Sequence, residues 1–151
     1  SFLIGYLMPE EYFYFVGELR NFSKKQVDDF LIDFEDLFNN EILGGKKYIR
    51  DLSKGNQKKV GIVAALIGDP KVIVLDEPFA NLDPTTQIRL KKIIKNLSKK
   101  EDVTVLVSSH DLQDVTEVSD RIVLLEKGLI IKDIKKTTKT LKDLESYFTK
   151  E

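Results

Sequence analysis

Residues 72–78 have the sequence VIVLDEP, and they decide the fold class of this protein. The first four residues are apolar and mostly β-branched, which predicts a strand buried on both faces of a parallel sheet. Two acids, Asp76 and Glu77, end the run. In open α/β sheets, ligands bind at the carboxyl ends of the strands. The segment therefore predicts an α/β protein with candidate functional groups at that edge.

A helix and a second strand follow this segment. Asp83 is a good N-cap, Pro84 suits the first helical position, and apolar residues then recur at helical spacing as far as Leu97. Residues 103–107, VTVLV, predict a second buried strand, and hence a right-handed βαβ crossover. Three further elements are expected downstream: a short helix at 111–118, a hairpin at a sheet edge from 121–125 to 129–131, and a helix that carries Leu141, Leu144 and Phe148 on one face.

Upstream, the hydrophobic period is that of helices. Residues 1–7 predict a short strand, but residues 24–38 predict one amphipathic helix with Ser23 as its N-cap. A loop then leads to a helix at 57–67. We therefore expect three regions: a strand and loop of the core at 1–10, a small helical subdomain at 11–56, and the main core at 57–151.

The composition excludes several classes of function. The 151 residues are 42% hydrophobic, enough for one globular domain. Lys and Arg number 24 against 25 Asp and Glu, so no basic field favours nucleic acid. The chain has no cysteine, which excludes a disulfide, a thiolate metal site and a cysteine nucleophile. No apolar run reaches the roughly 20 residues needed to span a bilayer, so any membrane partner is another chain.

Polar residues follow both predicted strands of the crossover. Asp76 is suited to hold Mg²⁺, and Glu77 to orient or deprotonate an attacking water; the alternative is that both acids cap a turn in solvent. His110, the single histidine, is expected at the same edge, where it could contact a phosphate or that water; a lone histidine is more often a surface or core residue. Ser108 and Ser109 lack a nucleophile elbow, so a serine hydrolase is rejected.

Together these segments resemble the ATPase subunits of ABC transporters. Residues 72–78 are similar to the Walker B strand, residues 80–83 to the D-loop, and residues 109–111 to the switch histidine. Residues 52–57, LSKGNQ, resemble the ABC signature LSGGQ, with Lys54 in place of a glycine and Asn56 where glutamine is usual. Four motifs in this order are more specific than any one of them.

The sequence also departs from that family. The phosphate-binding pattern G-x-x-x-x-G-K-[ST] does not occur, and the chain begins without Met, so we expect that an N-terminal part of the domain is missing and that this chain alone is inactive. Glu10 stands where many members have the Q-loop glutamine, which puts a direct role with the metal in doubt. The passage from Tyr14 to Phe15 is shorter than in the family, so we also expect that residues are missing between them.

The resemblance implies a fold and an activity. The implied fold is a RecA-like P-loop NTPase, with a parallel sheet flanked by helices and a small helical subdomain. The implied activity is ATP hydrolysis with Mg²⁺, in which Glu77 activates water, Asp76 holds the metal and His110 senses the γ-phosphate. The nucleotide-binding residues implied by the motifs are Ser53, Gly55, Asn56, Gln57, Asp83 and Glu10.

It also implies partners. Two ATPase subunits would pair head to tail, with Ser53 and Gly55 closing the partner's site and Asp83 near the seam. A membrane-spanning subunit would bind the helical subdomain and the Q-loop region, so the protein would lie on the cytoplasmic face of the membrane. The aromatic residues at 12–15 suit such a contact or pack the subdomain against the sheet. Within the family, the sequence most resembles the ATPases of bacterial ABC-2-type exporters. The alternatives are a non-transport ABC ATPase and a regulatory fragment without catalysis.

Overall fold

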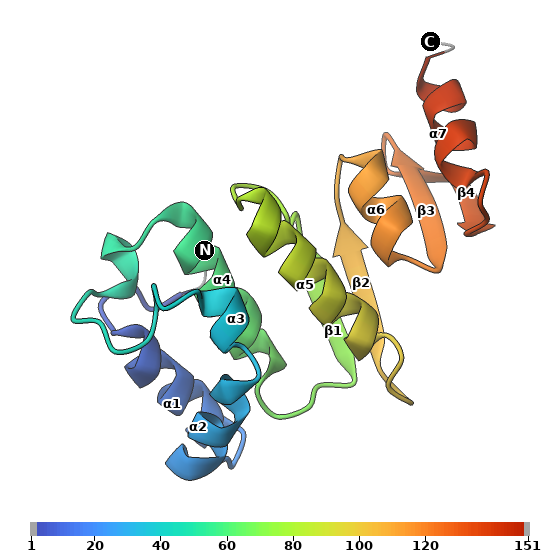
Figure 1. The fold of residues 1–151 in the computed structure, drawn as a ribbon. Coiled ribbons are helices and arrows are strands. Elements are labelled where there is room, and N and C mark those ends of the chain that lie inside the picture. The colour runs from blue at the N-terminus through green and yellow to red at the C-terminus, as the bar shows by residue number, and fades with distance from the viewer. Residues whose placement is uncertain (1–2, 150–151) are drawn as a thin grey trace.

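The computed structural model describes residues 3–149. Its helices are α1 (Pro9–Leu19), α2 (Lys24–Ile32), α3 (Glu35–Phe38), α4 (Lys54–Leu66), α5 (Pro84–Leu97), α6 (Leu112–Val118) and α7 (Thr140–Phe148), with a 3-10 turn at Ile49–Asp51. Its strands are β1 (Val72–Asp76), β2 (Thr104–Ser108), β3 (Arg121–Glu126) and β4 (Leu129–Lys135). Figure 1 shows α1 to α4 gathered at one end of the molecule and β3, β4 and α7 at the other. None of the helices described between residues 3 and 149 is long and apolar enough to cross a membrane.

The predicted βαβ crossover is confirmed. Strand β1 pairs with β2 in parallel, in a register that runs from Val72 opposite Thr104 to Asp76 opposite Ser108. Helix α5 connects them, and the Asp83 carboxylate caps it by accepting from the Thr86 backbone N–H at 3.0 Å. The carboxyl ends of both strands therefore lie side by side at one edge, as the sequence predicts.

The sheet is buried on one face only, which corrects the prediction. Ile73 and Leu75 are buried, whereas Val72 and Val74 are 66% and 65% exposed. Leu106 of β2 is also exposed. Successive strand residues point to opposite faces. Helix α4 contacts β1, and the exposure of Val72, Val74 and Leu106 shows that the other face of the strand pair is open.

The buried residues of the helical end belong to the same hydrophobic core as those of β1 and α5. Helix α1 contacts both α2 and α4, and the ring centroids of Phe13 and Phe38 lie 5.8 Å apart. The single helix predicted for 24–38 is wrong, because the chain leaves the helix at Asp33 and Phe34 before α3 begins. Phe34, at that break, is buried and lies with its ring centroid 4.9 Å from that of Phe30. Tyr14 and Phe15 both lie inside helix α1. That residues of the family are missing between them stays a prediction.

The strand predicted at residues 1–7 is also wrong for the described residues 3–7. This segment forms a turn, in which Leu7 N–H donates to the Ile4 carbonyl at 3.1 Å. The carbonyl oxygens of Gly5 and Leu7 accept from the backbone N–H groups of Arg50 and Ile49, at the 3-10 turn. Those carbonyl groups therefore bond to the segment before α4 rather than to a neighbouring strand.

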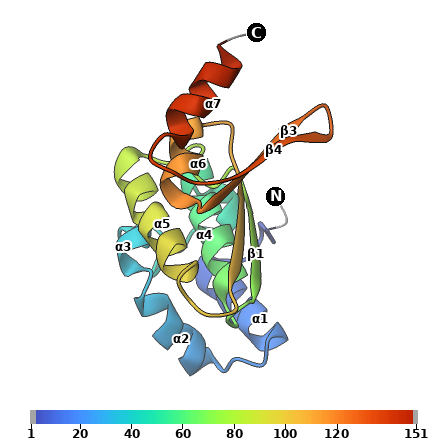
Figure 2. The ribbon, with the colours of Figure 1, turned by 90° about the vertical axis from the view of Figure 1, so that its right-hand side faces the viewer.

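The C-terminal hairpin forms as predicted but not at the edge of the parallel sheet. Strands β3 and β4 pair with each other in a separate antiparallel sheet. Lys127 and Gly128 take positive φ values of 49° and 82°, which suit a two-residue hairpin turn. Figure 2 shows this hairpin projecting from the body of the molecule. Helix α7 packs on α6, with Leu144 buried.

Candidate active site

Asp76 and Ser108 meet at the edge where the parallel strands end. The Ser108 hydroxyl donates to Asp76 Oδ1 at 2.5 Å. The backbone N–H of Glu77 donates to the Ser108 carbonyl at 3.1 Å and to its hydroxyl at 3.2 Å. Ser108 was weighed from the sequence only as a nucleophile. In the structure it is a hydrogen-bond partner that holds the acids at the end of β1.

Glu77 and His110 form the closest pair of titratable groups at this edge. His110 Nδ1 lies 2.8 Å from Glu77 Oε1, and the His110 backbone N–H donates to the same oxygen at 3.0 Å. This hydrogen bond and the negative charge of Glu77 raise the pKa of His110 above its usual 6.5. The imidazole is 85% exposed, so it is open to a ligand. The sequence prediction that both residues face one edge is confirmed.

The backbone at Glu77 is unusual. Its φ is +45°, in the left-handed region that non-glycine residues seldom adopt. Such conformations cost about 1–3 kcal/mol and persist where the surroundings hold them. Here β1 ends and the chain turns, so that the Glu77 side chain points back to His110 after β2. The strained backbone of this turn therefore directs the Glu77 carboxylate toward His110.

The arrangement of Asp76 fits a magnesium ion. Mg²⁺ is usually bound by one or two carboxylates together with waters and substrate phosphates, rather than by a cage of protein ligands. Asp76 offers one carboxylate beside a hydroxyl, and no group of three or more acidic or histidine ligands occurs among residues 3–149. Waters and phosphate oxygens would thus complete the coordination of a metal at this edge.

The residues of the LSKGNQ segment form the start of α4. The Ser53 hydroxyl caps the helix by accepting from the Asn56 N–H at 3.2 Å. A Cβ atom on Gly55 would lie 2.8 Å from the Asn81 carbonyl oxygen, closer than real Cβ contacts. Gly55 is therefore required for the close approach of α4 to the loop that follows β1. That approach brings two of the predicted motifs into contact.

The amide side chains at this helix start hold neighbouring loops. Asn56 Nδ2 donates to Glu41 Oε2 at 3.1 Å, and this bond is among the causes that lower the pKa of Glu41. Gln57 Nε2 donates to the carbonyl oxygens of Leu52 and Arg50 at 2.9 and 3.2 Å. Both residues thus fix the conformation of the segment that carries Ser53.

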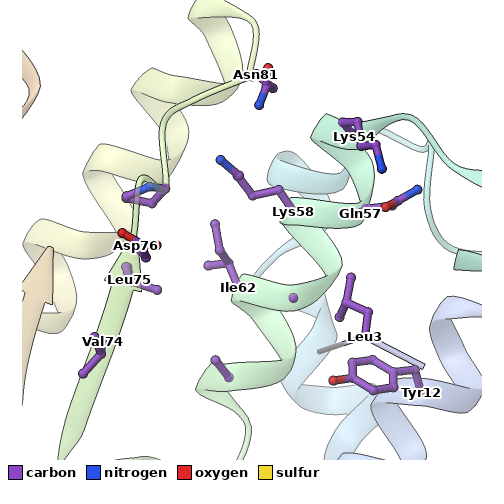
Figure 3. Close-up of a pocket in the computed structure, with 13 residues that line it drawn as sticks. Leu3, Tyr12, Lys54, Gln57, Lys58, Ile62, Val74, Leu75, Asp76 and Asn81 are labelled. Atoms are coloured by element: carbon purple, nitrogen blue, oxygen red, sulfur yellow. The ribbon is translucent and has the colours of Figure 1, made fainter. Parts of the chain in front are cut away.

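Lys58 joins α4 to the acidic edge, and sequence analysis missed it. Its ammonium group donates to the carbonyl oxygens of Glu77 at 2.6 Å and Ala80 at 2.8 Å. Burial lowers the pKa of Lys58 from its usual value, against the charges of Glu77 and Asp76, which raise it. Figure 3 shows its side chain reaching from α4 toward the end of β1, across a cleft of about 430 Å³ that also contains Asp76 and Asn81.

The sequence matches known ATP-binding proteins. A family model described as "AAA domain, putative AbiEii toxin, Type IV TA system" matches residues 12–113. The energy-coupling factor transporter ATP-binding protein EcfA2 of Staphylococcus epidermidis is 35% identical over 113 residues, which are 74% of this chain and 39% of the relative. An uncharacterised ABC transporter ATP-binding protein of Methanocaldococcus jannaschii is 36% identical over 137 residues, 83% of this chain and 51% of the relative. The chain belongs to the ABC ATPase family.

Solved ABC ATPase structures have the same fold. An ATP-binding subunit of an ABC transporter is 25% identical, with a TM-score of 0.77 over 97% of this chain and 58% of the other. A dimeric ATP-binding cassette in a post-hydrolysis state with ADP and Pi is 26% identical, with a TM-score of 0.70 over 89% of this chain and 59% of the other. The chain spans about two fifths to one half of the length of the curated ABC relatives described above. The predicted P-loop NTPase fold is confirmed.

Two residues implied by the ABC resemblance make their described hydrogen bonds with partners outside the Asp76–His110 edge. Asp83 caps α5, and hydrogen bonds from Thr86 lower the pKa of its carboxylate. Glu10 lies in the first turn of α1, where its carboxylate accepts from the Gly44 N–H at 2.5 Å. The described bond of Glu10 thus joins α1 to a surface loop. A role of either residue at a nucleotide remains a prediction.

Proposed function

We propose that this chain carries the hydrolytic edge and the signature helix of an ATP-hydrolysing ABC subunit, which powers transport by a separate membrane subunit. The observation that supports this most directly is the Glu77–His110 pair beside Asp76, at the carboxyl edge of two parallel strands. ATP is the substrate that such a family member takes. The full activity belongs to the full-length gene product, because the phosphate-binding pattern is not in these 151 residues.

In this proposal Glu77 is the general base. Both short contacts from His110 go to Oε1, so we assign Oε2 to the attacking water. Glu77 would orient that water in line with the γ-phosphate and accept its proton. His110, held on the carboxylate, would contact the γ-phosphate through its exposed imidazole. The positive φ of Glu77 supports this role, because strained backbone is common where a side chain is aimed at a substrate.

Asp76 would hold the Mg²⁺ ion, which supplies charge neutralisation at the β- and γ-phosphates when bound. The Ser108 hydroxyl orients Asp76 by its hydrogen bond to Oδ1. This leaves Oδ2 for the ion or for a water that coordinates it. Removal of the metal by a chelator is expected to stop hydrolysis.

Further parts of the proposal concern partners. Ser53 and Gly55 would close the site of a second ATPase subunit, with Asn56 and Gln57 fixing their segment and Asp83 near the seam. The regions at 1–10 and 11–56 would contact the membrane subunit, which would hold the protein at the cytoplasmic face. Relatives that support these assignments include a dimeric cassette and a transporter ATP-binding protein. Residues 57–151 would then form the remainder of the catalytic core.

The test is ATP hydrolysis by the full-length gene product with the substitution Glu77→Gln. Loss of a positioned general base lowers turnover by about 100-fold or more, while ATP binding is retained. The control is Glu101→Gln, which replaces an exposed acid between α5 and β2 and is expected to leave turnover unchanged. This 151-residue chain is assayed alongside and is expected to be inactive. Full turnover by the Glu77→Gln protein would refute the assigned role.

A further inference from the structure

Lys58, in helix α4, binds the backbone of the turn at residues 77–81 that follows β1. Its ammonium lies within hydrogen-bond distance of two carbonyl oxygens, those of Glu77 and Ala80. Ala80 N–H in turn donates to the Glu77 carbonyl at 3.3 Å. The lysine therefore closes the turn between these residues from outside. Figure 3 shows that Lys58 comes from α4, and in the sequence it directly follows Gln57, the last residue of the signature segment.

This turn needs an external support. Glu77 and Asn81, at its two ends, have φ values of +45° and +63°, although neither is glycine. A cation that accepts no hydrogen bonds and donates up to three is well suited to satisfy converging carbonyl groups. Charge-assisted hydrogen bonds are about twice as strong as neutral ones. Partial burial of the ammonium strengthens them further, because the surroundings have a lower dielectric constant than water.

The same helix touches the turn a second time. Gly55 lies so close to the Asn81 carbonyl oxygen that an added Cβ would be at 2.8 Å. Helix α4 is therefore attached to the loop after β1 at two points, one by close packing and one by the Lys58 ammonium. A movement of the start of α4 cannot leave the backbone of Glu77 unaffected while both contacts hold.

We propose that Lys58 is a positioning residue, through which the signature helix α4 sets the orientation of the Glu77 carboxylate. The inference rests on the proposed function, because it assigns Lys58 a role in that reaction. Lys58 acts on the backbone of Glu77 and not on the nucleotide. Its loss is expected to lower the rate of hydrolysis without weakening nucleotide binding.

The first test compares steady-state ATP hydrolysis by full-length Lys58→Met, Lys58→Arg and Lys99→Met. Methionine keeps an unbranched apolar side chain but has no donor, whereas arginine keeps donors and charge. Lys99 is exposed near the end of α5 and serves as the matched control. We expect Lys58→Met to lower kcat at least 10-fold with KM within 2-fold, Lys58→Arg to recover a measurable part of that loss, and Lys99→Met to behave as wild type.

The second test does not depend on turnover. His110 is the single histidine, so its imidazole NMR signals report directly on the Glu77 contact. Loss of that contact is expected to bring the pKa of His110 in Lys58→Met back toward 6.5, with no change in Lys99→Met. If the full-length parent protein has no ATPase activity, the proposed function is refuted. A lowered pKa of His110 in Lys58→Met would still show that Lys58 positions Glu77.

Two outcomes would overturn the inference. Wild-type kcat together with an unchanged imidazole titration in Lys58→Met would show that the turn holds Glu77 without the lysine. A rise in KM alone, with kcat unchanged, would make Lys58 a nucleotide ligand. If Lys58→Met folds poorly, Lys58→Arg still tests the inference. Arginine keeps the donor groups, so kcat and the imidazole titration of this variant should lie nearer to those of the parent protein.

Discussion

The substitution Gly55→Ala tests the contact between α4 and the loop after β1. Alanine at this position would place Cβ 2.8 Å from the Asn81 carbonyl oxygen. An ordinary contact begins at 3.4 Å, so helix and loop have to separate by about 0.6 Å. The atom that has to move belongs to the backbone, and so the strain cannot be relieved by rotating a side chain. Gly61→Ala, in the same helix, is the matched control, because its Cβ would lie 3.5 Å from Leu3 Cδ2.

The expected energies have opposite signs. Replacing glycine by alanine inside a helix stabilises it by about 1 kcal/mol, which Gly61→Ala should gain. Overpacking costs about 1–3 kcal/mol, and Gly55 lies in the first turn of α4, where less is gained from helix propensity. We therefore expect Gly55→Ala to be less stable than Gly61→Ala by about 2–4 kcal/mol, the sum of the two effects. For a protein of this size that difference corresponds to several degrees in Tm.

Urea unfolding and thermal melts of the two variants, each compared with the parent protein, provide the measurement. The reasoning predicts a lower midpoint for Gly55→Ala and an equal or higher midpoint for Gly61→Ala. If both substitutions stabilise the protein equally, the close approach at Asn81 does not exist in solution. If both destabilise it equally, the cost comes from the helix and not from the contact with the loop.

Two further predictions concern charged groups. NMR titration of His110 should give a pKa above 6.5, and the substitution Glu77→Gln should lower that pKa. Because the pKa is raised in the folded state, the stability contributed by the Glu77–His110 pair is complete below pH 6.5. It is lost as the pH rises through the pKa of the folded protein. An unshifted parent pKa would contradict the Glu77–His110 contact. Lys91 is buried, and its Nζ lies 2.8 Å from Asp114 Oδ1 and 2.6 Å from Glu117 Oε2. The substitution Lys91→Met should destabilise the protein by about 1–3 kcal/mol, because it leaves both carboxylates without this partner. Lys91 lowers the pKa of Glu117, so this contribution is present at neutral pH and lost in acid; an equal effect at pH 7 and pH 3 in urea unfolding would refute it.

Much of the crossover could be predicted from local patterns. The apolar run at 72–75, the cap at Asp83 and the second run at 103–107 each carry a local signal, and the right-handed connection follows from a general rule. The same rule predicted that Glu77 and His110 lie at one edge of the sheet, where the structure shows them in contact. The helix predicted at 57–67 is α4, but α4 begins three residues earlier, at Lys54. Its existence could be predicted because its hydrogen bonds are formed within a short segment.

The errors arose where neighbours in space decide the outcome. The exposure of Val72 and Val74 depends on which faces of the sheet are covered, and their alternation is hidden in a run that is apolar throughout. Residues 3–7 have the composition of a strand but bond to the turn at Ile49–Asp51. In the same way, α2 ends at Ile32 although the helical spacing of apolar residues continues beyond it.

The sequence by itself determined the fold class, the order of the motifs and the placement of Glu77 and His110 at one edge of the strands. These depend on hydrophobic period, capping residues and spacing along the chain, all of which are local. Only the tertiary structure assigned Ser108 to Asp76 and Lys58 to the carbonyl groups of Glu77 and Ala80. A lysine near the start of a helix carries no sequence signal for such a role. Its partners are backbone atoms about 20 residues away, and they converge only when α4 packs beside β1.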